Sequence, residues 1–224
     1  MSVIPGEGRV EILYGASPLP VSPDREVYLA RPDFTGAHPV VIVVAGDQGV
    51  SPSIKALCRR LARYGYAALA LDLFRTAEPE SLAAIPPVRI AADLLDLLSV
   101  TRDEWSDWCA ADRFGVLGLG AGAAAAARLA AERGAALAIS PSALEDVAGL
   151  LAGLTSPLLA FLSGPGGDVP AVRATVGRGE WVVYGSAGPG FFDDGSEDYD
   201  RPAAEDAFRR FIAFLDAWLT RVEV

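Results

Sequence analysis

The residues with the clearest chemical meaning lie around a glycine-rich turn at residues 118–122, where an apolar run meets an alanine-rich one. The spacing is that of the G-x-S-x-G turn, which presents a nucleophile between a strand and a helix, with Gly120 in the nucleophile's place. We expect a positive φ at Gly120, because that turn is strained and glycine adopts such a backbone without steric cost. Gly120 carries neither a hydroxyl nor a thiol, so it cannot form an acyl-enzyme. The same spacing is also compatible with a nucleotide-binding turn or with close packing alone.

Few other residues favour metal or thiol chemistry. Cys58 and Cys109 are predicted to be buried, reduced thiols rather than a disulfide or a metal site. The single histidine, His38, precedes a strand and is expected to be a surface turn residue, and one histidine excludes most histidine-based metal sites. Asp193 and Asp194 could suggest calcium, but an acidic loop in an acidic protein needs no ion. We therefore expect no cofactor and no metal.

The elements that must position the turn alternate between strands and helices. Apolar runs bounded by turn residues predict strands at residues 10–13, 26–30, 40–45, 66–71, 114–119, 135–140, 157–162 and 180–184. Apolar residues at helical spacing predict helices at residues 52–64, 90–98, 122–134, 144–154, 170–175 and 208–219. The run at 40–45 is apolar on both faces, as a central parallel strand should be.

This alternation predicts one α/β domain over residues 1–224, with a mostly parallel sheet covered by helices on both faces. In such a sheet the ligand crevice lies outside the carboxyl ends of the strands. The loops expected at that edge are residues 46–50, 72–75, 119–122, 163–170 and 185–196.

The charge of the chain argues against several classes of partner. The 224 residues carry a formal net charge of -10 without a basic cluster, which disfavours nucleic-acid phosphate or an anionic membrane as a partner. The first residues do not have the pattern of a signal peptide, and no apolar run approaches the roughly 18 residues of a membrane span. We expect a cytoplasmic protein whose partner is a small molecule, and the composition leaves a homo-oligomer open.

Four segments of the chain resemble the dienelactone hydrolase family of α/β-hydrolases. They are YLARP, LARYGYAALALDLFR, the turn at 118–122 and, near the C-terminus, GFFDDGSEDYDRPAAEDAFRRFIAFL. The resemblance extends over residues 10–219 and implies the α/β-hydrolase fold, with a mostly parallel central sheet and helices on both faces. It also implies a catalytic triad of a cysteine or serine, a histidine and an acid.

Two of these three positions carry unreactive residues in this chain. Gly120 corresponds to the family's nucleophile, and Pro189 stands where the family commonly has the histidine. The family's acid lies in a loop similar to SGPGGDVP, where Asp168 is the nearest candidate. Pro189 has neither a titratable group nor an N–H, so no loop movement restores a base there. The resemblance therefore implies a hydrolase scaffold with a degenerate triad.

The oxyanion hole would survive, because backbone groups form it. Its donors would be the N–H of Ala121, at the start of a helix, and the N–H of Asp47. The Asp47 carboxylate is the first candidate for an acid or base that acts without a covalent intermediate. It must be protonated or turned aside if the hole holds an anion. The alternative is that Asp47 caps the following turn or helix.

Other candidate residues have weaker support. Gln48 could donate to a substrate carbonyl but suits an exposed loop equally. The resemblance places Arg75 near a substrate carboxylate, although a surface ion pair explains it as well. Asp168 could be a relic acid, a new base or a structural residue of its loop. Further residues that could line the pocket are Gly120, Tyr184, Pro189, Phe191 and Phe192. Core packing would explain the three aromatic residues equally well.

Three functions fit these residues. The leading hypothesis is a repurposed, non-hydrolytic enzyme, a cyclase, lyase or isomerase that acts on a small, mostly apolar metabolite. The second is a protein without catalysis, either a small-molecule binder or a pseudoenzyme that partners an active relative. The third is weak hydrolysis by a carboxylate-activated water, in which Asp47 or Asp168 would replace the whole triad.

Overall fold

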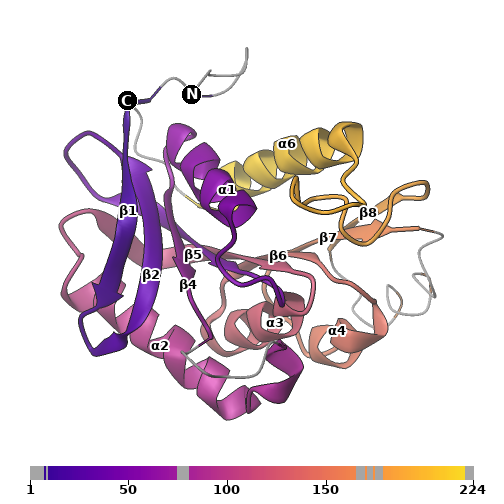
Figure 1. Cartoon of the computed structure of the whole chain (residues 1–224), viewed down its shortest axis with the longest axis horizontal. Coiled ribbons are helices and arrows are strands. Elements are labelled where there is room, and N and C mark those ends of the chain that lie inside the picture. The colour runs from indigo at the N-terminus through magenta and orange to yellow at the C-terminus, as the bar shows by residue number, and fades with distance from the viewer. Residues whose placement is uncertain are drawn as a thin grey trace.

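Figure 1 shows a twisted sheet with helices on both sides. The computed structural model describes residues 8, 10–74, 81–164, 170, 174 and 179–219. The strands in this part of the chain are β1 (Ile12–Leu19), β2 (Ser22–Pro32), β3 (His38–Val44), β4 (Ala67–Leu71), β5 (Cys109–Leu119), β6 (Ala136–Ser140), β7 (Leu158–Ser163) and β8 (Glu180–Tyr184). The helices are α1 (Pro52–Arg63), the short 3₁₀ helix η1 (Leu82–Ala84), α2 (Pro87–Asp103), α3 (Gly122–Arg133), α4 (Glu145–Leu151) and α6 (Arg201–Trp218). Of the helix expected at 170–175, only Pro170 and Ala174 are among the described residues.

The described strands form one sheet in the order β1-β2-β4-β3-β5-β6-β7-β8. β1 pairs antiparallel with β2, and β2 pairs antiparallel with β4. The pairings from β4 through β8 are parallel. This confirms the expected α/β-hydrolase fold. Because parallel strands end at the same edge, the loops that follow them meet there.

Strand β3 is buried on both faces, as its unbroken apolar sequence predicts. Val40, Ile42 and Val44 pack into the core on one side of the sheet, and Val41 and Val43 pack into the core on the other side. These five side chains are at most 1% exposed. Burial of this kind requires helices on both sides of the sheet.

Different helices cover the two faces. α1 and α6 lie on one side, and α2, α3 and α4 lie on the other (Figure 1). On the first side, the Arg60 guanidinium of α1 donates two hydrogen bonds to the Glu205 carboxylate of α6, the shorter at 2.6 Å. The same guanidinium lies 3.8 Å from the centre of the Phe208 ring. A bidentate ion pair and a cation–π contact therefore join α1 to α6.

Residues that favour helix ends lie at the start of α1 and at the end of α3. The Ser51 hydroxyl accepts a hydrogen bond from the amide of Ile54 at 3.3 Å, and Pro52 begins α1. Gly134 ends α3 with a φ of 71°, the left-handed conformation that glycine adopts without steric cost. Among the described residues, no helix is both long and apolar enough to cross a membrane.

The N-terminal hairpin is longer than expected. The strand predicted at 10–13 overlaps the start of β1, and the one predicted at 26–30 lies within β2. Both strands continue through the proline-rich segment to a turn at Pro20 and Val21. Pro18 is tolerated within β1 because that strand lies at the edge of the sheet, where a missing N–H leaves no acceptor unpaired. Pro18 therefore lies in an edge strand rather than in a loop.

The expectation that His38 is a surface turn residue is wrong. His38 begins β3 and is fully buried, because β5 extends back to Cys109, which pairs with His38 across the sheet. The ring packs edge-on against Phe34, with ring centres 4.7 Å apart. Burial lowers the pKa of His38 below the ordinary value of a histidine. His38 lies at the end of β3 opposite the crevice, so it cannot serve there as a base.

A buried ion pair joins the hairpin to α2. The Arg25 guanidinium of β2 and the Asp93 carboxylate of α2 lie 2.5 Å apart, and both side chains are almost fully buried. Arg89, one turn earlier on α2, lies 3.5 Å from the same carboxylate and donates to the Leu73 carbonyl at 2.6 Å. These contacts fix α2 against the hairpin and against the segment that follows β4.

Candidate active site

A cavity of about 790 Å³, which we call the elbow cavity, opens at the carboxyl edge of the sheet. Its walls come from residues 46–49, 51–54, 119–121, 140, 142, 189–190, 192–193 and 195–198. These segments follow β3, β5, β6 and β8, so the cavity occupies the position predicted for the crevice.

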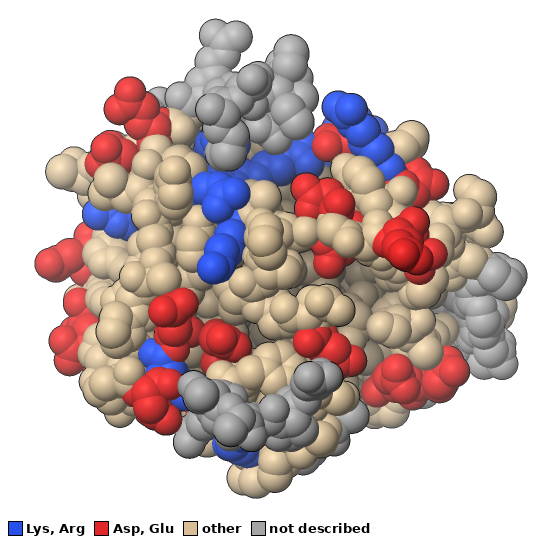
Figure 2. Space-filling view, viewed as in Figure 1, with Lys and Arg blue, Asp and Glu red and all other residues tan. Residues whose placement is uncertain are grey.

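The elbow cavity is acidic. Its described lining contains four carboxylates and neither lysine nor arginine, the four being Asp47, Asp193, Glu197 and Asp198. The excess of acidic residues is not confined to the cavity. On the face shown in Figure 2, acidic side chains are more frequent than basic ones over the described part of the chain. The charge of the walls disfavours an anionic ligand.

The turn between β5 and α3 has the geometry of a nucleophile elbow. β5 ends at Leu119, Gly120 has a φ of 54°, and α3 begins at Gly122. The amide of Gly120 donates to the Ser140 carbonyl at 2.8 Å, and the Gly120 carbonyl accepts from the amide of Ala123 at 3.1 Å. The positive φ expected at Gly120 is confirmed, and position 120 lies on the cavity wall.

Glycines on either side of the turn allow backbones to approach closely. A Cβ atom on Gly118 would lie 2.6 Å from the α3 backbone, and one on Gly122 would lie 2.4 Å from the Ala45 carbonyl oxygen. Gly118 is therefore required where β5 meets α3, and Gly122 where α3 meets the end of β3. A Cβ atom on Gly120 would meet the Ser142 hydroxyl at 3.4 Å, an ordinary contact. The backbone angle, rather than space, restricts position 120.

Two backbone amides could stabilise negative charge in the elbow cavity. The Ala121 amide lies at the N-terminus of α3, which has no side-chain cap, and the helix dipole favours an anion there. The loop after β3 packs beside it, since a Cβ atom on Gly46 would lie 3.4 Å from the Ala121 nitrogen. In the part of the chain that the structure describes, neither the Ala121 amide nor the Asp47 amide donates to another group.

The Asp47 side chain is exposed at the elbow cavity and bonded to the segment before α2. Its Oδ1 accepts a hydrogen bond from the amide of Leu82 at 2.7 Å, at the start of η1. Asp47 thus caps a helix, as one interpretation of the sequence held, but the helix is η1 rather than the one that follows it in the chain. A carboxylate has two acceptor oxygens, so Oδ2 can still take a proton. Gln48 is also exposed and lines the same cavity.

The two neighbouring phenylalanines of the last loop have different environments. Phe192 lines the elbow cavity together with Pro189. Phe191 is fully buried, and its ring centre lies 5.0 Å from that of Tyr184. Phe191 therefore anchors the loop in the core, while Phe192 borders the elbow cavity and packs against Phe161.

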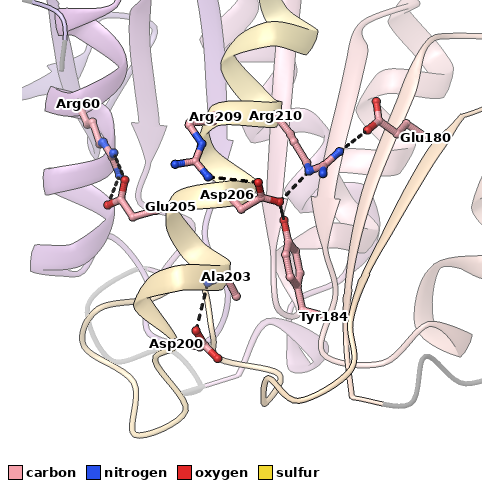
Figure 3. A network of polar contacts seen from close by, with 9 residues as sticks. All are labelled: Arg60, Glu180, Tyr184, Asp200, Ala203, Glu205, Asp206, Arg209 and Arg210. Atoms are coloured by element: carbon pink, nitrogen blue, oxygen red, sulfur yellow. Dashed lines mark hydrogen bonds and ion pairs between the residues drawn. The ribbon is translucent and has the colours of Figure 1, made fainter. Parts of the chain in front are cut away.

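Tyr184 points toward α6 rather than lining the elbow cavity. Its hydroxyl donates to the Asp206 carboxylate at 2.9 Å, and Arg210 donates to the same carboxylate at 2.7 Å (Figure 3). Burial raises the pKa of the Tyr184 phenol above its ordinary value, and the Asp206 carboxylate adds to the shift. The structure places Tyr184 in the packing between β8 and α6.

The elbow cavity brings together six of the residues selected from the sequence, namely Asp47, Gln48, Gly120, Ala121, Pro189 and Phe192. Two further candidates, Arg75 and Asp168, lie outside the described residues. No group of three histidine, cysteine, aspartate or glutamate side chains able to hold a metal ion occurs among the residues that are described.

Sequence reasoning missed Ser140 and Ser142, which both line the elbow cavity. β6 ends at Ser140, and β6 is the neighbour of β5 in the sheet. A signal for them exists, because the apolar run at 135–140 leads into Ser-Pro-Ser at the edge where the elbow lies. Neither serine has an imidazole beside it, since the only histidine of the chain is at the other end of β3.

Known proteins share both the sequence pattern and the fold. The model of the dienelactone hydrolase family matches residues 26–165. A Salmonella typhi protein named "Putative carboxymethylenebutenolidase" is 31% identical to this chain, over 86% of this chain and 82% of its own length.

Solved structures agree with this similarity. The crystal structure titled "Putative Dienelactone Hydrolase" from Klebsiella pneumoniae has a TM-score of 0.80 at 24% identity and covers 92% of this chain and 99% of its own. A dienelactone hydrolase-like promiscuous phosphotriesterase from metagenomic libraries has a TM-score of 0.73 at 17% identity, over 93% of this chain and 98% of its own. At such identities the likeness shows the fold alone. With the family match and the Salmonella typhi relative, it follows that this chain belongs to the dienelactone hydrolase family.

Proposed function

We propose that this chain binds a small, neutral carbonyl compound at the elbow and catalyses a proton transfer on it without a covalent intermediate. The reaction class is that of an isomerase, lyase or cyclase. One arrangement on the cavity wall carries the proposal: Gly120 offers no nucleophile, while the adjacent Ala121 presents an amide N–H with no acceptor among the described residues. A site of this kind can polarise a carbonyl although it cannot attack one.

Each group has a defined role in the proposal. The amides of Ala121 and Asp47 donate to the carbonyl oxygen and stabilise the negative charge that it gains as the substrate becomes an enolate. Oδ2 of Asp47 takes a proton from the carbon next to the carbonyl and returns it to another carbon, so that atoms and charge balance. The hydrogen bond from the Leu82 amide occupies Oδ1, which leaves Oδ2 as the oxygen that acts as the base.

The relatives' names and the cavity walls support a class of ligand. A carboxymethylenebutenolidase is named for a butenolide, an unsaturated lactone, that carries a carboxyl-bearing substituent, and the lactone carbonyl of such a compound fits the same two donors. The four carboxylates of the elbow cavity favour a neutral compound over a carboxylate. We therefore expect small unsaturated lactones or ketones.

Deuterium exchange tests the proposal without knowledge of the natural product. The neutral butenolide α-angelica lactone is incubated with the protein in D₂O, and the loss of its exchangeable C–H signal is followed by proton NMR. Asp47→Asn retains an oxygen that can accept from the Leu82 amide but removes the base. We expect the exchange rate to fall about 100-fold or more, with an unchanged melting temperature.

Asp193→Asn is the matched control for that variant. It removes one carboxylate from the same cavity wall and should leave the exchange rate within about twofold, since a single rim charge acts weakly in water. Exchange that persists in Asp47→Asn contradicts the role of Asp47. Fast ring opening that a serine- or cysteine-directed inhibitor blocks contradicts the whole proposal, because it requires a nucleophile.

One specific observation supports each of two other functions. A binder without catalysis is supported by the Asp47 side chain, which is exposed and already bonded to Leu82. Binding of the lactone without exchange or ring opening would favour it. Hydrolysis by a carboxylate-activated water is supported by the relatives' names. Slow ring opening that Asp47→Asn abolishes would favour that third function.

A further inference from the structure

A second cavity, which we call the apolar cavity, lies behind η1 and between α2 and α3. Its volume is about 300 Å³. Leucine, isoleucine and alanine side chains form most of its wall, including Leu82, Ile85, Ile90 and Leu94. A space of this size is at the lower limit of small-molecule sites. Its walls offer water few hydrogen-bond partners, so apolar groups fit it better than water does.

Small side chains on α3 keep the apolar cavity open. Ala121, Ala124 and Ala125 border it, and their spacing of three and four residues places them on one face of the helix. The opposite face of α3, with Ala123 and Ala126, is fully buried against the sheet. A leucine at position 124 or 125 would extend into the cavity, whereas one at 123 or 126 would collide with the sheet.

The apolar cavity borders the elbow cavity at two points. Ala121 lines both cavities. Leu82 lines the apolar cavity, and its amide donates to Asp47, which lines the elbow cavity. The residue whose amide would hold a carbonyl oxygen, Ala121, therefore also borders an apolar space.

We propose that the apolar cavity takes the hydrocarbon substituent of the ligand whose carbonyl oxygen lies at the Ala121 amide. The inference rests on the proposed function and narrows its ligands to neutral carbonyl compounds with one unbranched or monocyclic hydrocarbon substituent. Three charged residues border the far side of the apolar cavity, namely Arg128, Glu132 and Asp146. A substituent long enough to reach them loses the benefit of apolar surroundings, so the cavity sets an upper limit on its length.

A series of methyl ketones tests this inference. Binding of 2-butanone to 2-decanone is measured by NMR titration, with the Ala121 amide reporting on the carbonyl end and the Ala124 methyl group, which borders the same cavity, on the tail. In the unaltered protein, affinity should rise up to about fourfold for each added CH₂, until the tail reaches the charged rim. Ala125→Leu fills the cavity and should abolish this increase while leaving the affinity for 2-butanone unchanged.

Two further variants keep the test decisive. Ala213→Leu makes the same change on an exposed position of α6, and it should retain the full dependence on chain length. Ile90→Ala enlarges the apolar cavity and should move the optimum to a longer ketone, so the test does not depend on the folding of one variant.

The outcomes separate this inference from the proposed function. If ketones shift the Ala121 amide with the same affinity at every chain length, the apolar cavity has no role, and the proposed function stands. An Ala125→Leu variant that weakens short and long ketones equally overturns the inference in the same way. If no ketone shifts the Ala121 amide in any variant, the proposed function fails, and the inference fails with it.

Discussion

The Oδ1 atom of Asp47 lies 2.7 Å from the amide nitrogen of Leu82, and this contact joins segments 35 residues apart in the chain. Asp47 borders the elbow cavity and Leu82 the apolar cavity. This hydrogen bond therefore joins a residue of one cavity wall to a residue of the other. Its loss should first lower the protection of the η1 backbone from hydrogen exchange.

Asp47→Ala should release the start of η1. Because a hydrogen bond of this kind contributes about 1 kcal/mol, we expect the Leu82 amide to exchange with solvent about fivefold faster. Asp47→Asn keeps an acceptor oxygen and should exchange at the original rate. Hydrogen exchange followed by NMR measures both variants. Equal protection of Leu82 in the alanine variant would show that the contact does not form in solution.

Gly120→Cys should give a thiol that reagents reach from the elbow cavity. A Cβ atom has room at this position, although the positive φ costs a non-glycine residue about 1–2 kcal/mol. The native thiols should not react, because burial raises the pKa of both Cys58 and Cys109 to about 12. Mass spectrometry after iodoacetamide treatment should therefore find one adduct in the variant and none in the original protein. A folded variant that resists labelling would place position 120 away from the cavity.

Asp93→Asn should destabilise the fold strongly. It removes the Asp93 carboxylate from the buried Arg25 guanidinium, and breaking a buried ion pair on one side costs about 3–5 kcal/mol. Urea denaturation measures the free energy of unfolding. Asp103→Asn, the same change at an exposed position of α2, should alter it by less than about 0.5 kcal/mol. A similar decrease in the free energy of unfolding in the two variants would mean that the buried ion pair does not stabilise the fold more than an exposed carboxylate does.

Stability should fall on mild acidification because of His38. Burial lowers the pKa of His38 in the folded protein, whereas the unfolded chain titrates near 6.5. Below about pH 6.5 the unfolded chain therefore binds a proton that the folded protein does not, and stability declines as the pH falls through the folded pKa. His38→Leu, measured by urea denaturation between pH 7 and 5, should have a flatter profile. An unchanged slope would assign the loss of stability to other groups.

The repeating apolar patterns made most of the fold predictable. β3 and α1 begin and end within two residues of their predicted limits, because strand burial and helix capping are both local properties of the sequence. The position of His38 was not predictable in this way. Its burial depends on residues 109–113 extending β5, and that stretch has no alternating apolar pattern.

The parts of the candidate site that depend on local backbone conformation could be predicted from the sequence. The parts that depend on contacts between distant segments could not. Gly120 followed from a five-residue motif, and its φ agrees. The partner of Asp47 could not be inferred, because no local pattern relates it to Leu82. Phe191 and Phe192 are adjacent and chemically identical, so only the path of the folded loop separates the core residue from the cavity residue.

The loop between β8 and α6 is attached to the rest of the domain at several points away from the elbow cavity. Phe191 is sunk in the core, the Gly164 amide donates to the Ala187 carbonyl at 2.9 Å, and Asp200 caps α6 at Ala203. Pro189 and Phe192 line the elbow cavity from the same loop, but Phe192 also packs against Phe161, with ring centres 6.2 Å apart, and so takes part in that attachment. This arrangement resembles a framework that carries a variable loop: new specificities can be sampled at Pro189 while the scaffold beneath it remains the same.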